Sequence, residues 1–136
     1  MLGAEIRCVM TPTYGRIRIA EAVQQNSVAI LFQHGLNGHL EAYAKNLMAL
    51  SSTFYVIAFD YVGHGLSDKT INAYSPAIFA EQLLELMDVL QIESAHLSGE
   101  SLGGAGCQAC SRSRCPLLCC AGRRRALAPI RSSGRI

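Results

Sequence analysis

The sequence predicts an α/β protein with a partial, doubly wound and mostly parallel sheet. Two observations lead to this prediction. Residues 28–33 and 54–59 are short, near-continuous apolar runs, as expected for strands buried on both faces of a sheet. Residues 41–51 and 75–90 carry apolar side chains at helical spacing and lie between or after these runs. Strands that alternate with helices of this length form βαβ units, which place their strands parallel.

The first half of the chain supplies most of the expected elements. Residues 16–22 alternate in polarity and predict a strand, and a similar stretch around residues 5–9 predicts another before it. The helix over residues 41–51 is expected because apolar side chains recur at i, i+4 and i+7. The next helix is expected to start with Ser75 at its N-cap and Pro76 at its first position, since both residues favour helix initiation there.

A last strand is expected over residues 94–100. The sequence after Gly104 has no helical apolar stripe that a buried crossover helix could use, so we expect the strand at 95–100 to be an edge without an outer neighbour. In parallel α/β sheets the chemistry lies at the carboxyl ends of the strands. Three segments of this sequence follow such ends, namely 34–39, 60–68 and 99–103.

The segment Gly99-Glu100-Ser101-Leu102-Gly103 has the Gly-x-Ser-x-Gly pattern of a nucleophile elbow, after a strand and before an expected helix. The pattern has a steric cause, because glycines without Cβ atoms let neighbouring segments approach a strained turn. The helix N-terminus behind the serine favours negative charge that develops during acyl transfer. Taken alone, the five residues equally suit a glycine-rich turn without chemistry.

The loop over residues 34–38 reads His-Gly-Leu-Asn-Gly and follows a buried strand, where the second part of an oxyanion hole is expected. Backbone N–H groups of Leu36 and Leu102 are expected to converge on one oxygen. Two such motifs with a strand and a helix between them favour a catalytic site over two unrelated turns. The residues expected to support this loop are His34, Gly35, Asn37 and Gly38.

Three segments, taken in order, resemble the α/β-hydrolase superfamily. They are the 34–38 loop, Phe-Asp-Tyr-Val-Gly-His-Gly-Leu-Ser-Asp at 59–68 and Leu-Ser-Gly-Glu-Ser-Leu-Gly-Gly at 97–104. Residues 34–104 most resemble the bacterial meta-cleavage-product (C–C bond) hydrolases and their 2-hydroxymuconic-semialdehyde hydrolase relatives. The resemblance implies that Ser101 is the nucleophile and that a small-molecule product of aromatic-ring cleavage is cleaved by water, without a cofactor. Carboxylesterases and lactonases share these segments and remain an alternative.

The histidines and aspartates of the first hundred residues are expected to organise loops or strands rather than to act as the catalytic base. In this fold the triad follows the order serine, acid, histidine along the chain. No acidic residue and no histidine follows Glu100. We therefore expect this chain to be inactive, although its lineage is that of a serine hydrolase. The residues concerned are His34, His39, His64, His96, Asp60 and Asp68.

Composition changes abruptly near residue 104. Residues 1–100 hold all ten acidic residues but only five of the twelve basic ones, and no aromatic residue follows Phe79. We therefore expect residues 1–104 to be the N-terminal part of a hydrolase domain. Residues 105–136 are expected to be an atypical tail rich in cysteine and arginine, frameshifted or disordered.

Three interpretations of this tail stay open, and a frameshift in GC-rich coding sequence is the favoured one. Cys107 and Cys110 have the spacing of a metal-ligand pair, but the short gap to Cys115 argues against a zinc site, so no metal is expected. A basic segment at 123–125 is a weak indication of nucleic-acid binding or targeting. The non-catalytic alternative is a short protein whose cysteine-rich tail binds a metal or a partner.

No apolar run of the sequence approaches the roughly 20 residues that span a bilayer. The first residues also lack a basic region followed by an apolar stretch, so no secretory signal is expected. We therefore expect a cytoplasmic protein without membrane or nucleic-acid partners. The sequence does not indicate an oligomeric state.

Overall fold

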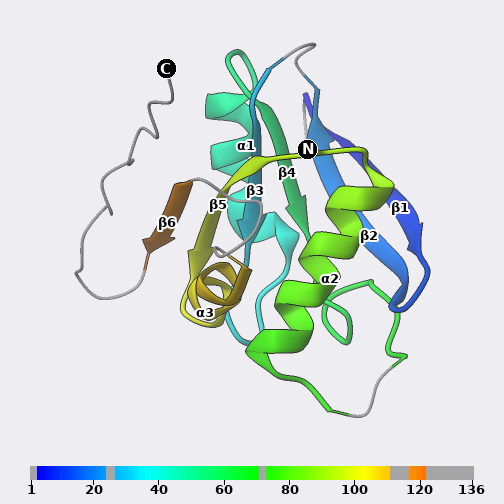
Figure 1. The fold of residues 1–136 in the computed structure, drawn as a ribbon. Helices are drawn as coiled ribbons and strands as arrows, with labels where there is room; N and C mark the ends of the chain where they lie inside the picture. Colours follow the sequence, from blue (N-terminus) through cyan, green and yellow to red (C-terminus); the bar gives the residue numbers. More distant parts are fainter. Residues whose placement is uncertain (1–2, 24–26, 71–72, 111–116, 122–136) are drawn as a thin grey trace, which may run out of the picture.

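The computed structural model describes residues 3–23, 27–70, 73–110 and 117–121, and side chains up to residue 107. The chain forms a six-stranded sheet in the order β1-β2-β4-β3-β5-β6 (Figure 1). The strands are β1 (Glu5–Thr11), β2 (Gly15–Ala22), β3 (Ala29–Gln33), β4 (Tyr55–Phe59), β5 (Ala95–Glu100) and β6 (Leu117–Ala121). The helical elements are the 3-10 turn η1 (Leu40–Tyr43) and the α-helices α1 (Ala44–Leu50), α2 (Pro76–Val89) and α3 (Leu102–Cys110).

The sheet is mostly parallel, as the sequence predicts. Strand β3 lies at its centre and pairs in parallel with both β4 and β5. Strands β1 and β2 form an antiparallel hairpin that is joined to β4, also antiparallel. Helices lie on both sides of this sheet (Figure 1), so the predicted α/β fold class is confirmed.

The outer neighbour of β5 corrects one expectation. Strand β6 pairs in parallel with β5, with His96 opposite Leu117 and Glu100 opposite Ala121. The prediction that the strand over residues 94–100 is an unpaired edge is therefore wrong. Five residues of the tail are enough to form this ladder, because backbone groups supply its hydrogen bonds whatever the side chains are.

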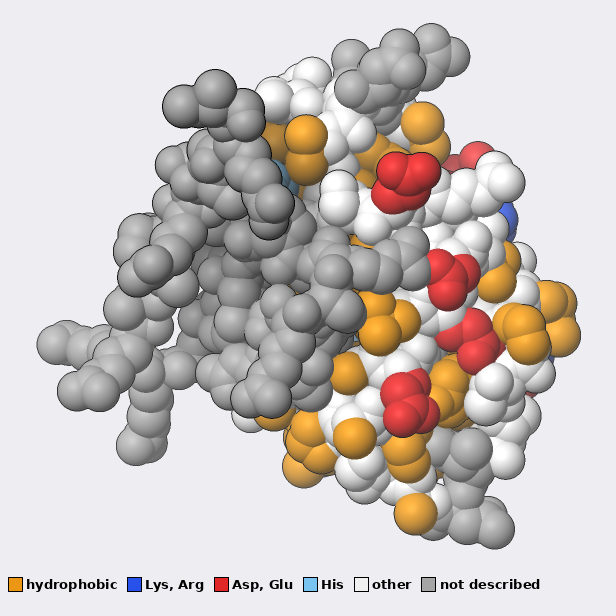
Figure 2. Space-filling model, viewed as in Figure 1, with side chains coloured by type: hydrophobic (Ala, Val, Ile, Leu, Met, Phe, Trp, Pro, Cys, Tyr) orange, Lys and Arg blue, Asp and Glu red, His pale blue; other side chains and the backbone are white. Residues whose placement is uncertain are grey.

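One face of the sheet packs against α2 and α3. Helix α2 starts as predicted, with the Ser75 hydroxyl accepting a hydrogen bond from the Ile78 N–H at 3.3 Å. Its apolar side buries Phe79, Leu83 and Leu86 against the strands. Its outer side is visible in Figure 2, where acidic side chains are spread over the surface, in keeping with the excess of acid in the first hundred residues.

Helix α3 crosses the predicted boundary near residue 104 and continues to Cys110. The expectation that the sequence after Gly104 cannot form a helix packed on the sheet is wrong for residues 105–110, where small residues rather than an apolar stripe make the contact. A Cβ atom on Gly106 would lie 2.9 Å from the Gln33 side-chain oxygen and 3.0 Å from the Tyr61 hydroxyl. Cys107 is fully buried beside them.

The opposite face packs against η1 and α1, which together form the helix predicted over residues 41–51. Leu40 and Leu47 are fully buried there against Val56 and Ala58 of β4. The first turn is 3-10 rather than α-helical, and its N-cap residue His39 makes no side-chain capping hydrogen bond. Of the helices that the structure describes, none is long and apolar enough to cross a membrane.

Candidate active site

Ser101 occupies a sharp turn between β5 and α3. Its backbone has φ +53°, in the left-handed region, which costs a residue with a side chain about 1–3 kcal/mol. A Cβ atom on Gly99 would lie well inside 3.0 Å of the Gly103 carbonyl, and one on Gly103 well inside 3.0 Å of the Gln33 carbonyl oxygen. Both positions therefore require glycine, and the strained turn expected from the sequence is present.

The loop that follows β3 lies directly against this turn. A Cβ atom on Gly35 would be 3.4 Å from the Glu100 carbonyl oxygen and 3.5 Å from the Ser101 Cβ. The loop is closed by the Gly38 N–H, which donates to the Gly35 carbonyl at 3.0 Å, and Asn37 takes a left-handed conformation with φ +60°. The two motifs predicted from separate parts of the sequence are thus neighbours in space.

A hollow of about 340 Å³ opens beside the turn. It brings Leu36 and Leu102, the two residues predicted to supply oxyanion donors, into the same lining. The rings of Tyr74 and Phe79 are nearly parallel, and the His64 ring stands edge-on to both. The residues that line this hollow are Leu36, Asn37, Gly63, His64, Tyr74, Ser75, Pro76, Phe79 and Leu102.

His34 holds the loop rather than facing the serine. Its Nδ1 lies 2.8 Å from the Gly35 carbonyl oxygen, and its Nε2 lies 3.2 Å from the backbone N–H of Tyr61. A carbonyl only accepts and a backbone N–H only donates, so Nδ1 carries the proton and Nε2 accepts. Burial lowers the pKa of His34 because it disfavours the charged ring, and the neutral ring satisfies both contacts.

Asp60 connects the loops that follow β3 and β4 at the carboxyl ends of these strands. Its fully buried carboxylate accepts hydrogen bonds from the backbone N–H of Leu40 at 2.7 Å and of Leu66 at 3.0 Å. Arg18 of β2 pairs with the same carboxylate at 3.2 Å and also with Glu41. These contacts agree with a loop-organising role for Asp60.

Gln33 and Arg18 support the site and were not among the residues singled out from the sequence. The Gln33 side chain accepts a hydrogen bond from the Tyr61 hydroxyl at 2.8 Å and donates to Cys107 Sγ at 2.7 Å. Its carbonyl oxygen accepts from the Tyr43 hydroxyl at 2.7 Å, and burial raises the pKa of Tyr43 to about 12. A polar residue at the end of an apolar run is the signal that could have indicated Gln33, since buried polar groups need partners.

The remaining candidates are spread around the site. His39 pairs with Glu41 at the surface, and Asp68 accepts a hydrogen bond from the Arg16 N–H at 2.9 Å. His96 lies on β5 and faces a different hollow. Within the part of the chain that the structure describes, no histidine ring hydrogen bonds to the Ser101 hydroxyl.

Possible metal ligands are likewise considered only among the residues that the structure describes. Among the described side chains, no group of three or more histidine, cysteine or acidic residues could hold a metal ion. The cysteine cluster considered in the tail has most of its side chains outside the described residues.

Known proteins share the sequence of the strained serine turn and of its neighbouring loop. A sequence profile of the alpha/beta hydrolase fold family matches residues 28–112. The chain belongs to this family. The match includes β3, the loops at 34–38 and 60–68 and the Ser101 turn of this α/β hydrolase.

Two curated relatives illustrate the similarity of this α/β hydrolase. A dihydrolipoyllysine-residue acetyltransferase component of an acetoin cleaving system from Pseudomonas putida is 36% identical over 89 residues, which are 65% of this chain and 24% of that protein. The 3-oxoadipate enol-lactonase 1 of Acinetobacter baylyi is 35% identical over 80 residues, 59% of this chain and 30% of that protein. The chain thus spans less than a third of the length of either.

A solved structure gives the same relation. Carboxylesterase CesB from Bacillus subtilis superposes with a TM-score of 0.74 at 28% identity, and the alignment covers 85% of this chain and 41% of that one. The chain therefore spans less than half of the length of that structure.

Proposed function

We propose that Ser101 is the nucleophile of a hydrolase that breaks a bond next to a carbonyl group. The left-handed backbone of Ser101 carries this proposal, because a non-glycine residue holds such a conformation only where its surroundings enforce it. Here Gly99 and Gly103 make the close approach possible, and the loop containing Gly35 packs beside the serine. Strain of this kind gathers at functional sites, and the residues that enforce it here belong to the two predicted motifs.

In the proposed mechanism the Ser101 hydroxyl acts on the substrate carbonyl carbon. The negative charge that develops on the carbonyl oxygen, in an enolate or a tetrahedral species, is stabilised by the backbone N–H groups of Leu36 and Leu102. One such donor contributes about 3–4 kcal/mol to lowering the barrier. The N-terminus of α3 begins at Leu102 and adds a favourable electrostatic contribution.

The substrate we propose is a 2-hydroxy-6-oxo-dienoate-type product of aromatic-ring cleavage, whose carbon–carbon bond is cleaved by water. The resemblance of residues 34–104 to meta-cleavage-product hydrolases motivates this choice. The hollow beside Ser101 supports it, since the exposed ring of Tyr74 in its lining offers a flat apolar face to a planar conjugated acid.

Hydrolysis of an ester or lactone is the second candidate. It is favoured by the relatives, because the names of two of them describe an enol-lactonase and a carboxylesterase. The nucleophile and the oxyanion donors would be the same, and only the leaving group would differ. A tetrahedral intermediate would then replace the enolate in the oxyanion hole.

The two candidate substrates are distinguished by an assay of the enzyme that a corrected gene encodes. We expect a single-base correction near codon 104 to restore a reading frame that contains a late aspartate and histidine. Absence of both residues would contradict the proposal that the gene descends from that of an active serine hydrolase. The corrected enzyme is then given a ring-cleavage dienoate and an activated ester. Faster turnover of the dienoate supports carbon–carbon cleavage, and turnover of the ester alone supports the second candidate. Ser101→Ala should abolish whichever activity is found.

The chain as it stands is expected to have negligible hydrolase activity. No histidine or acidic residue follows Ser101, and a serine without a general base keeps a pKa far too high to attack. The measurement is turnover of an activated ester by the 136-residue chain. Turnover that disappears in Ser101→Ala would show that another residue serves as the base.

A further inference from the structure

Strand β1 is the outermost strand on one side of the sheet (Figure 1), and among the described residues it pairs only with β2. The edge of a strand that faces away from its neighbour carries backbone N–H and C=O groups that can pair with a further strand. Proteins ordinarily block such edges with proline, a bulge or a very short strand. The seven residues of β1 contain no proline and pair with β2 without interruption. None of these devices therefore blocks the outer edge of β1.

The first half of β1 is the exposed part of this edge strand. Its first four residues, Glu5–Cys8, are all exposed, whereas two of its last three are buried. Val9 belongs to the cluster under α2 and α3, and the Thr13 N–H just after the strand donates to the Glu85 carboxylate of α2 at 2.7 Å. An added strand therefore has the most room along Glu5–Cys8.

The alternation of side chains limits how a second copy of β1 can pair with the first. Residues directly opposite each other in an antiparallel pair lie on the same face of the sheet. Two copies that extend one sheet are related by a two-fold axis perpendicular to it, so the axis must pass through a residue and not between two residues. Along the exposed half, the axis can lie at Glu5, Ile6, Arg7 or Cys8.

The charges of β1 distinguish between these four positions. An axis at Glu5 or at Arg7 places that residue opposite its own copy, and like charges directly opposite each other destabilise a strand pair. An axis at Cys8 creates no pair of opposite charges. An axis at Ile6 places Glu5 opposite the partner's Arg7 and Arg7 opposite the partner's Glu5, with the two isoleucines together at the centre. The Ile6 axis therefore gives two attractive charge pairs and an apolar contact.

The ion pairs within one copy leave these charges available. Glu5 lies opposite Glu21 in the β1–β2 ladder, and the carboxylate of Glu21 is buried and paired with Arg7. Among the described residues, Glu5 forms no ion pair of its own. The Arg7 side chain is still 41% exposed, and a guanidinium has five N–H donors, so it can bind a second carboxylate. The open edge thus presents an unpaired acid beside a partly exposed base.

We propose that β1 is the docking edge for a second copy of this chain, through an antiparallel pair of β1 strands centred on Ile6. The ladder spans residues 4–8 of each copy and joins the two sheets into one. A ladder this short lies at or below the low end of the roughly 1,200–2,000 Å² that stable interfaces bury. The dimer is therefore weak and reversible, with a dissociation constant of about 10–1,000 μM. The proposal does not depend on the chemistry of Ser101.

Sedimentation equilibrium of the full chain under reducing conditions measures this association. We expect a dimer fraction that rises with protein concentration. Glu5→Lys should raise the dissociation constant by about tenfold, because it places an ammonium group opposite the partner's Arg7. Ile6→Lys should raise it similarly, since it places two like charges together at the axis. Glu93→Lys is the matched control, with the same change of charge at an exposed position before β5, and should leave the constant unchanged.

Cysteine cross-linking tests the register separately. Cys8 is a free, exposed cysteine, and with the axis at Ile6 it lies opposite the partner's Ala4. Directly opposed Cβ atoms are close enough for a disulfide after a small shift. Ala4→Cys should therefore form an intermolecular bridge to the partner's Cys8 under mild oxidation, and peptide mapping by mass spectrometry distinguishes it from bridges of the tail cysteines. In the wild type, the two Cys8 residues lie apart along the ladder and should not be linked to each other.

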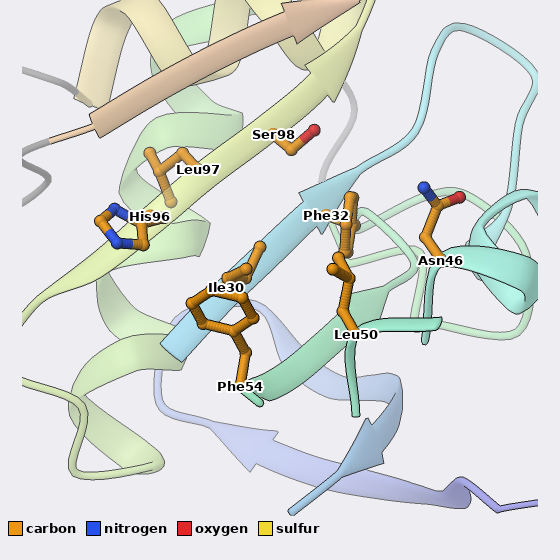
Figure 3. Close-up of a pocket in the computed structure, with 8 residues that line it drawn as sticks. All are labelled: Ile30, Phe32, Asn46, Leu50, Phe54, His96, Leu97 and Ser98. Carbon is orange, nitrogen blue, oxygen red and sulfur yellow. The ribbon is translucent and has the colours of Figure 1, made fainter. Parts of the chain in front are cut away.

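Three results would overturn the proposal. One is a folded chain that stays monomeric at about 1 mM. Another is a dimer that neither Glu5→Lys nor Ile6→Lys weakens, with circular dichroism showing that both variants fold. The contact would then lie elsewhere, and weakening by Asn46→Arg would assign it to the apolar hollow of about 360 Å³ over β3 and β5 (Figure 3). The third is a bridge between two Cys8 residues in the wild type, which would place the axis at Cys8.

Discussion

The two faces of the sheet differ in how completely they are packed. Among the described residues, the face under α2 and α3 buries nineteen residues in one cluster, whereas the face under η1 and α1 buries six. The larger cluster extends from the β1–β2 hairpin to Cys107, so it reaches across most of the sheet. The smaller cluster is confined to the strands near α1. Among the described residues, the first face is therefore packed across most of the sheet, whereas the second is packed only near α1.

The strained serine turn is built on the first of these faces. Gly103 packs against the Gln33 backbone, and the Gln33 side chain binds Cys107 of α3. The contacts that position Ser101 therefore belong to the more extensively packed face. The following predictions test whether the two faces contribute unequally to stability and to the Ser101 turn.

The largest difference is expected between two leucines that are both fully buried, Leu83 on α2 and Leu47 on α1. Leu83→Ala should lower the free energy of unfolding by about 4 kcal/mol, because its surroundings are packed on all sides. Leu47→Ala should lower it by only about 2–3 kcal/mol, since Leu47 belongs to the smaller buried cluster, which can collapse more readily around the lost volume. Urea denaturation of both variants measures this, and equal losses would contradict the difference between the faces.

Gly103→Ala should lower the free energy of unfolding by about 3 kcal/mol, nearly as much as Leu83→Ala. The added methyl group would overlap the Gln33 carbonyl, which is backbone and cannot move aside. Gly35→Ala is the matched control, because its Cβ would be 3.4 Å from the Glu100 carbonyl and needs only a small shift. Its loss should stay below about 1 kcal/mol. If both variants unfold at the same urea concentration, close approach does not hold the turn.

Substitutions at the N-caps of α2 and η1 should lower the free energy of unfolding by smaller and unequal amounts. Ser75→Ala removes the side-chain cap of α2 and should cost about 1 kcal/mol. His39→Ala changes the N-cap of η1, which has no side-chain capping hydrogen bond, and should have an effect within about 0.5 kcal/mol. Thermal unfolding monitored by circular dichroism compares the two. A larger loss in His39→Ala would show that the α1 side depends on contacts at its start.

The smallest effect is expected from the titration of His34. Its pKa is lowered in the folded protein from the ordinary value of 6.5, so the unfolded chain binds a proton more readily. The contribution of His34 to stability is complete above pH 6.5 and is lost as the pH falls from there through the lowered folded value. The urea midpoint of the wild type should therefore fall more between pH 7 and pH 5 than that of His34→Gln. Equal pH dependence of the urea midpoint in the wild type and in His34→Gln would contradict this expectation.

Local patterns in the sequence account for much of the fold. The apolar runs at 28–33 and 54–59 became β3 and β4, and the Ser75-Pro76 pair began α2. These features could be predicted because they depend on periodicity and on capping within a few residues. The turn at Ser101 belongs with them, since its glycine spacing reflects a steric need that shows directly in the sequence.

Features that depend on distant partners could not be predicted in the same way. The ladder between β5 and β6 joins a tail segment whose composition favours no strand. The burial of Asp60 depends on Arg18, which lies in a strand of alternating polarity where an arginine is ordinarily exposed. In both cases the partner is fixed by the tertiary fold, and neither residue pattern indicates it.

The contacts that enforce the conformation of Ser101 also imply an order of events during synthesis. Gly103 must meet Gln33, and Gly35 must meet Ser101, yet each pair is far apart along the chain. Contacts that close long loops form late in folding, because the loop entropy is lost before the contact is gained. On the ribosome, β3 and its first parallel partner β4 emerge well before β5, the second partner of β3. A nascent chain therefore carries an ordinary, relaxed serine at position 101 until β3 and β5 are joined.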